Sequence, residues 1–473
     1  MIDISDCSSL SRVMHFFEEI SRIPHGSGNV SAIADYLCAF AIERGLSYSR
    51  DGAQNVVIRK PATPGYEKRP TVIIQGHTDM VCAVAEGVAK DMDTEGLSIY
   101  RDGDFLRAEG TTLGGDDGIA VAYALAILDL SDIEHPAIEA CFTSDEEIGL
   151  LGAAALDASL LSGRIMINID SDDEGVFTVG CAGGVRADVS LPVEREIAKG
   201  NIYDLSLFGL IGGHSGIEID KGRENSIKLL AELLSDIGDA KIASFSGGNA
   251  DNAIPRDAKA SFFSDIGREN IEAIAEHLCN IYRSKESNIE YSLSEHFEEC
   301  AALTRESSDL LLRLIESEPS GVIKMSEDIP GLPETSLNMG VASLADREFD
   351  LTFSIRSAKA SAKAELLSRV KDIAEGLSAS VCSHGDYPGW EYKKDSRLRD
   401  VMCKVYEEMY NEPARVVTIH AGLECGLFSD KLPGLDCVSI GPDNYDIHTP
   451  SEHLSLSSCA RVWEFLLRVL KEI

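Results

Sequence analysis

The chain has 473 residues, of which 44% are hydrophobic and 26% charged, and this composition is typical of a globular protein with two or three domains. Its net charge of −36 disfavours binding to nucleic acid or to an anionic membrane, because phosphate groups would be repelled. The sequence contains neither a run of about 18 apolar residues nor a basic start followed by an apolar segment, so we expect no membrane span, no secretion signal and a cytoplasmic location.

Helical and strand patterns alternate over residues 1–185, which we predict to be the first part of an α/β domain. Between two of the strands, apolar residues recur at helical spacing over 119–130. Ligands gather beyond the carboxyl ends of strands in such sheets, which is where His77, Glu147 and Asp170 lie. Short apolar runs that end in polar residues indicate the strands, at 71–76, 138–143 and 164–170.

A different pattern begins after Gly183–Gly184 and extends over residues 186–390. Apolar and polar residues alternate over 349–356, which indicates a strand with one solvent-facing side. Helical apolar spacing occurs at 223–238 and 269–284. We therefore predict an inserted α+β lid domain of antiparallel sheet and helices.

The last section, residues 391–473, returns to helix, strand and helix. Because His448 lies in this section, we expect it to rejoin the first domain and complete a mixed-sheet α/β/α catalytic domain. The expected elements cover 395–411, 415–440 and 456–472.

The twelve cysteines, Cys7 among them, occur singly, without the two-to-four-residue spacing of a zinc ribbon or a redox pair. For a chain of this size without a secretion signal, we interpret them as reduced and mostly buried thiols.

Several short polar motifs at the ends of apolar runs have the chemistry of a two-metal site. His77 follows a strand, and Asp79 is placed to receive the proton of its other ring nitrogen. Asp116 opens a helix, and a carboxylate has two oxygens with which it can bridge two cations. Taken alone, these motifs also fit a turn histidine and helix-capping aspartates.

Glu146 and Glu147 are adjacent at a strand end, so one can bind metal while the other handles protons. Asp170 ends the next strand, and His448 adds a second imidazole far along the chain. In isolation, the two glutamates also fit a solvated surface pair.

Together these motifs resemble the co-catalytic two-zinc peptidase family of carboxypeptidases, aminoacylases and dipeptidases. Within that family, the chain most resembles the aminoacyl-histidine dipeptidase branch. The resemblance covers essentially the whole chain, and its motifs are GHTD, GGDDG, SDEEIG, INID and IHTPSE, with GGHSG, NAIPR, YPGW and HAGLE further along.

The resemblance implies a role for each of these residues. Asp116 would bridge two divalent metal ions, Glu146 would be the general base, and Asp79 would orient His77. A cis peptide bond is expected after Asp116. Zinc is the expected metal, although carboxylate and imidazole ligands also accept manganese and cobalt. The ligands implied are His77 and Asp170 for one ion and Glu147 and His448 for the other.

The resemblance also implies substrate contacts. His214 would stabilise the oxyanion, from its own or a partner subunit, or would simply bond within its glycine-rich turn. Arg356 would bind a substrate carboxylate, or would be a surface cation. Asn252 and Glu424 are weaker candidates, for substrate contact and for the free amino group respectively.

The implied activity is metal-dependent hydrolysis of dipeptides with release of the N-terminal residue, preferring Xaa-His substrates such as β-alanyl-histidine. The alternatives are a tripeptidase or an N-acyl-amino-acid deacylase of the same superfamily, because specificity resides in the inserted domain. A noncatalytic binding protein would be expected to lack a ligand or the base. The family likeness also implies a homodimer formed through the inserted domain.

Overall fold

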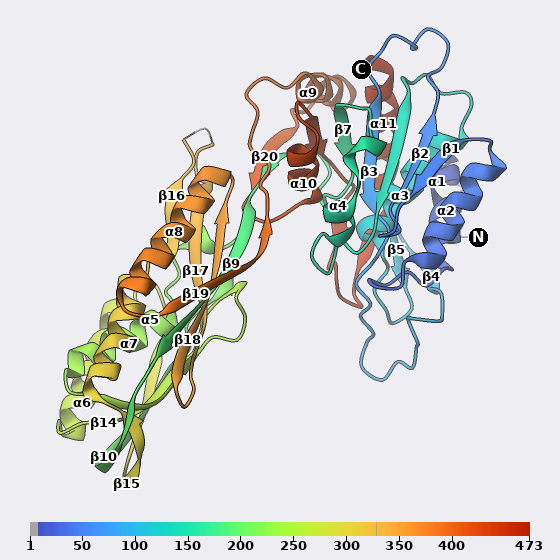
Figure 1. The fold of residues 1–473 in the computed structure, drawn as a ribbon. Coiled ribbons are helices and arrows are strands. Elements are labelled where there is room, and N and C mark those ends of the chain that lie inside the picture. Colours follow the sequence, from blue (N-terminus) through green and yellow to red (C-terminus); the bar gives the residue numbers. More distant parts are fainter. Residues whose placement is uncertain (1–7, 328) are drawn as a thin grey trace. The chain divides into compact units, whose positions relative to one another are not determined.

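The structure, a computed structural model, describes residues 8–327 and 329–473 and divides into two units (Figure 1). The first unit comprises the described residues up to Gly180, together with Tyr392–Thr418 and Leu423–Ile473. The second comprises Cys181–Glu391 and Ile419–Gly422, so these last four residues cluster apart from the section in which the sequence placed them.

The first unit is built on a mixed sheet of eight strands in the order β1-β2-β6-β3-β7-β21-β8-β20. Its strands are β1 (Ser47–Arg50), β2 (Val56–Lys60), β3 (Val72–His77), β6 (Ile138–Thr143), β7 (Ile165–Asn168), β8 (Val176–Cys181), β20 (Arg415–Ile419) and β21 (Asp436–Ser439). A smaller sheet contains β4 (Ile99–Asp102), β5 (Phe105–Ala108), β22 (Asn444–Tyr445) and β23 (His453–Ser455).

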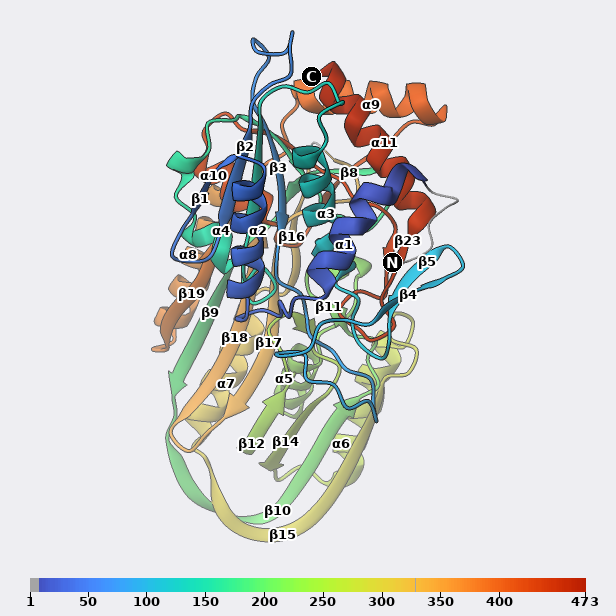
Figure 2. The same ribbon diagram turned by 90° about the vertical axis from the view of Figure 1, so that its right-hand side faces the viewer.

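Helices cover the larger sheet, and Figure 2 shows α1, α2 and α11 in front of its strands. In α1, Val13, Phe16 and Ile20 recur at helical spacing and are buried. The alanine-rich α3 is buried almost all round and packs closely against α1 and β3. The helices are η1 (Ser8–Leu10), α1 (Ser11–Ser21), α2 (Ser31–Glu43), α3 (Gly115–Asp129), α4 (Leu151–Ala155), η2 (Ala158–Leu160), α9 (Arg397–Tyr410), α10 (Glu424–Lys431) and α11 (Leu456–Glu472).

The three predicted strands β3, β6 and β7 are adjacent and parallel, and nearly every residue in them is buried. Such strands are continuous apolar runs because both faces of the sheet are covered. Their carboxyl ends therefore meet at one edge of the sheet.

The second unit is an antiparallel sheet of nine strands, with the order β15-β10-β14-β12-β17-β18-β9-β19 and β16 paired to β17. These are β9 (Gly183–Pro192), β10 (Arg195–Phe208), β12 (Lys241–Gly247), β14 (Ala258–Phe263), β15 (Glu290–Leu303), β16 (Gly321–Met325), β17 (Pro333–Leu344), β18 (Glu348–Ser357) and β19 (Ser380–Tyr387). A separate short pair joins β11 (Gly213–His214) to β13 (Ala253–Ile254).

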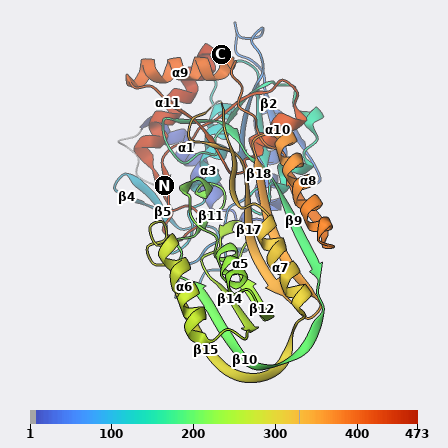
Figure 3. The same cartoon turned by 90° about the vertical axis from the view of Figure 1, so that its left-hand side faces the viewer.

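Helices pack on this sheet, as Figure 3 shows for α5, α6 and α7. In β18, Phe349, Leu351 and Phe353 are buried in the core and alternate with less buried polar residues, as the sequence predicted. The helices are η3 (Ile219–Lys221), α5 (Ser226–Ile237), α6 (Arg268–Tyr282), α7 (Arg305–Ser317) and α8 (Ala360–Gly376). The predicted two-domain architecture, with an α+β insertion in a mixed-sheet catalytic domain, is confirmed.

One prediction of secondary structure was wrong. Residues 415–440, expected to form a strand region, contain strand β20, helix α10 and strand β21. The first five residues of α10, Glu424–Phe428, are all buried, so the buried positions of this short helix do not show a helical repeat.

None of the eleven cysteines that the structure describes is in a disulfide, and six of them are buried; Cys7 lies outside the described residues. Over the same part of the chain, every helix is too short or too polar to cross a bilayer.

Candidate metal centre

The ends of the parallel strands bring together side chains that are distant in the sequence. His77 is the last residue of β3, Glu146 and Glu147 lie in the turn after β6, and Asp170 follows β7 by two residues. Parallel neighbours end at the same edge of the sheet, so these side chains converge there. Asp116, at the start of α3, and His448, between β22 and β23, reach the same place.

The two carboxylate oxygens of Asp116 face different histidines. Its Oδ1 lies 3.1 Å from His77 Nε2, and its Oδ2 lies 3.1 Å from His448 Nε2. A carboxylate in this position is arranged to bridge two cations. The peptide bond between Asp116 and Asp117 is cis, as expected from the family resemblance.

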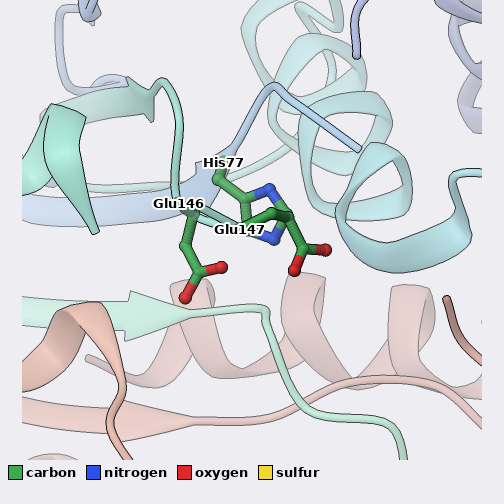
Figure 4. Close-up of side chains that lie close together, drawn as sticks. All are labelled: His77, Glu146 and Glu147. Atoms are coloured by element: carbon green, nitrogen blue, oxygen red, sulfur yellow. The ribbon is translucent and has the colours of Figure 1, made fainter. Parts of the chain in front are cut away.

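Three overlapping groups in the described chain have the residue types and spacing to hold a metal ion, with ligand atoms within 4.8 Å of one another. His448 Nε2 lies 2.9 Å from Glu147 Oε1, and His77 Nε2 lies 3.9 Å from Asp170 Oδ1. The groups are His77 with Asp116 and Asp170, Asp116 with Glu147 and His448, and His77 with Glu146 and Glu147; Figure 4 shows the last.

The donor chemistry of this cluster fits divalent cations. Imidazole nitrogens and carboxylate oxygens suit zinc, manganese or cobalt. Burial raises the pKa of Asp170, helped by the nearby carboxylates of Asp117 and Asp116. Burial also raises the pKa of Glu146 to about 8, with Glu424 and Glu147 adding to the effect and His77 opposing it. So many crowded acids are difficult to keep ionised without added positive charge, which bound cations would supply.

His77 is oriented from its Nδ1 side. Nδ1 donates to the backbone carbonyl oxygen of Asp79 at 2.9 Å, which leaves Nε2 as the nitrogen turned to Asp116. Burial opposes a charge on His77, but hydrogen bonds with Asp116 and Asp79 hold its pKa well above the ordinary value.

The Asp79 carboxylate has a second set of contacts that the sequence did not reveal. Its Oδ1, which lies 3.5 Å from His77 Nδ1, accepts the backbone N–H of Glu146 at 2.9 Å, and its Oδ2 accepts that of Glu147 at 3.3 Å. It also accepts the Ser27 hydroxyl at 2.8 Å. Asp79 therefore fixes the backbone of the glutamate turn as well as contacting His77.

Glu424 is fully buried in this unit and is held through one oxygen only. Its Oε2 accepts from Gln75 Nε2 at 2.5 Å and from the Thr143 hydroxyl at 2.7 Å, whereas Oε1 has no hydrogen-bond partner among the described residues. Burial raises the pKa of Glu424 to about 7, against the opposing effect of His77. Gln75 was not among the site residues predicted from the sequence, although a polar residue within a run of buried strand residues could have indicated it.

The other candidates lie in the second unit. Nδ1 of His214 accepts the backbone N–H groups of Gly216 at 3.1 Å and Ile217 at 3.2 Å, so Nε2 carries the ring proton. Burial and the Arg356 charge lower the pKa of His214. The guanidinium of Arg356 donates to the Tyr387 hydroxyl at 3.1 Å, and its buried Nε has no hydrogen-bond partner in the described residues. Asn252 is exposed.

Sequence comparison relates the chain to a family of peptidases. A sequence model described as peptidase family M20/M25/M40 matches residues 73–472. The chain is 36% identical over 482 residues to a curated protein of Escherichia coli (strain K12) named cytosol non-specific dipeptidase, and the alignment covers 99% of each chain.

Solved structures of peptidases also match the chain over nearly its whole length. The crystal structure of aminoacylhistidine dipeptidase from Vibrio alginolyticus matches with a TM-score of 0.92 and 34% identity, over 98% of this chain and 96% of that one. A tripeptidase from Staphylococcus aureus matches with a TM-score of 0.58 and 17% identity, over 98% and 97% of the two chains, which shows a shared fold.

Proposed function

The chain belongs to peptidase family M20/M25/M40, and on that basis we propose that it is a metal-dependent dipeptidase that releases the N-terminal residue of dipeptides. The observation that carries the proposal is the position of the Asp116 carboxylate, whose two oxygens face the imidazoles of His77 and His448. We further propose a preference for Xaa-His substrates such as β-alanyl-histidine, and a cytoplasmic location.

Two divalent ions, which we propose to be zinc, would share Asp116 as a bridging ligand. When bound, such a pair supplies Lewis acidity and lowers the pKa of water from about 15.7 towards about 7. His77 and Asp170 would complete one site, and Glu147 and His448 the other.

Glu146 would act as the general base. It would take a proton from the attacking water and pass it to the nitrogen of the leaving amine. Its place in the group with His77 and Glu147 supports this role. Asp79 would keep Glu146 in position through the backbone N–H that it accepts.

Glu424 would recognise the free ammonium group of the substrate. A buried carboxylate with one unpartnered oxygen favours a cationic partner, which an N-acylated amino acid does not offer. In the second unit, His214 would donate through Nε2–H to the oxyanion and Arg356 would bind the substrate carboxylate, with Asn252 as a further contact.

A substrate panel tests this proposal. We expect the purified protein to cleave β-alanyl-histidine and other dipeptides, to lose activity with a chelator, and to regain it with zinc, manganese or cobalt. The two full-length relatives are named for different specificities, so the ratio of kcat/KM between Xaa-His and other dipeptides measures the preference. Fast hydrolysis of acetylated amino acids alone would favour a deacylase, and of tripeptides alone a tripeptidase.

We also propose a homodimer formed through the second unit. Strand β15 lies at an edge of the sheet, and Ile197 and Phe297 on the β10–β15 pair are 70% and 68% exposed. Open strand edges and exposed apolar side chains favour association. Light scattering should give about twice the chain mass of 51.1 kDa, and replacing Phe297 by Asp should weaken the dimer. A single species of one chain mass would contradict this proposal.

A further inference from the structure

One side chain outside the metal groups holds the turn that carries Asp116. The carboxylate of Glu452 accepts the four consecutive backbone N–H groups of residues 113–116. Oε2 accepts from Leu113 at 2.7 Å and Gly114 at 3.0 Å, and Oε1 accepts from Gly115 at 2.8 Å and Asp116 at 3.3 Å. Glu452 is only 3% exposed, so these contacts are shielded from water.

The turn has no cap of its own. The residue before α3 is Gly114, which has no side chain to offer and adopts φ +68°, while Asp116 and Asp117 depart from helical geometry. Backbone N–H groups at the start of a helix need acceptors, and a carboxylate is the strongest acceptor at a helix N-terminus. Glu452 supplies these acceptors from a position 336 residues further along the chain than Asp116.

The approach of Glu452 also accounts for Gly115. A Cβ atom there would lie 3.1 Å from Glu452 Oε1 and 3.1 Å from Asn444 Nδ2, which is closer than ordinary packing allows. Glycine therefore lets the carboxylate reach the backbone of the turn.

Glu452 also belongs to the segment that carries His448. It lies four residues after that histidine, and its backbone N–H donates to the carbonyl oxygen of Thr449 at 3.1 Å. Asp116 and His448 are within hydrogen-bond distance of each other at 3.1 Å. One buried carboxylate thus ties together the two segments that provide these groups.

We infer that Glu452 is a positioning residue for the metal centre, which sets the backbone of the Asp116 turn and the distance between Asp116 and His448. This inference depends on the proposed function, because it takes Asp116 as the bridging ligand. Glu452 acts through backbone hydrogen bonds and lies in none of the three metal groups.

Replacing Glu452 by Gln tests the inference. In either orientation, the amide turns an NH2 group towards two backbone N–H groups, which then lose their acceptor. We expect metal affinity, measured by competition with a chelator, to fall by about 10–100-fold, as for other residues that support metal ligands. In the metal-free protein, hydrogen exchange of residues 113–116 should become faster.

Glu139→Gln is the matched control. Glu139 is also a buried carboxylate of the same unit, and it accepts the backbone N–H groups of Ser162 and Gly163 at 3.0 Å, before β7 begins. We expect this variant to lose stability while its metal affinity stays at the wild-type value. If Glu452→Gln lowers only the melting temperature and binds metal as Glu139→Gln does, Glu452 has a structural role and the inference is overturned.

Two further comparisons complete the test. Glu452→Asp keeps both oxygens on a shorter side chain, so its metal affinity should lie between those of the wild type and the Gln variant. If Glu452→Gln does not fold, the Asp variant decides the question. Wild-type metal affinity in the Asp variant would then overturn the inference. A wild-type protein that binds no metal would contradict the proposed function itself. Wild-type metal binding together with an unaffected Glu452→Gln variant would overturn only the role of Glu452.

Discussion

Replacing Glu146 by Gln is expected to remove almost all turnover and to leave the bound metal in place. Glutamine has nearly the same shape but cannot accept a proton, and general acid–base catalysis contributes about 10²–10⁴-fold in rate. Glu146 occurs in only one of the three metal groups, whereas Glu147 occurs in two. Loss of the Glu146 charge should therefore affect proton transfer more than metal binding.

The measurement is kcat for β-alanyl-histidine, together with the metal content per chain by mass spectrometry. Asp145→Asn is the matched control, because Asp145 is the preceding acid in the same turn and lies in none of the metal groups. Its Oδ1 accepts the backbone N–H of Gly28 at 2.6 Å, a contact that asparagine can keep. Wild-type turnover in Glu146→Gln would refute the role of general base, and loss of metal would show that Glu146 is a ligand.

The strands that carry the candidate site could be predicted from the sequence. β3, β6 and β7 are short apolar runs that each end before a polar motif, and the structure places them as predicted. Ligand residues at strand ends follow from this arrangement, because neighbouring parallel strands end together. The convergence of Asp116 and His448 followed only from the family resemblance, since no local pattern relates residues that are 332 positions apart.

The residues that hold the ligands in position could not be predicted. The contact of the Asp79 carboxylate with Glu146 spans 67 residues, and that of Gln75 with Glu424 spans 349. Periodicity shows which face of an element is buried, but it does not show which backbone N–H or side chain a given carboxylate meets. For the same reason, the sequence showed Glu452 only as the last residue of the IHTPSE motif and did not indicate its contacts with residues 113–116.

Replacing Asp116 by Asn is expected to disrupt both metal sites together. Asp116 belongs to two of the three groups, and each of its oxygens faces a different histidine. Asparagine keeps one oxygen and replaces the other by an NH2 group, which cannot bind a cation. We expect the metal content to fall from about two ions per chain to well below one, and kcat/KM to fall by at least about 10²-fold.

Asp129→Asn makes the same substitution at the other end of α3, where the carboxylate pairs with Arg12 and Arg44. This control should lose stability through the broken ion pairs while keeping the metal content and turnover of the wild type. Metal content should be measured on protein dialysed against buffer of defined zinc concentration, so that a weakened site is distinguished from an absent one. Two ions bound as tightly as in the wild type would exclude the bridging role of Asp116. Loss of one ion with the other retained would instead show that one remaining group, such as Glu147 with His448, holds a cation without it.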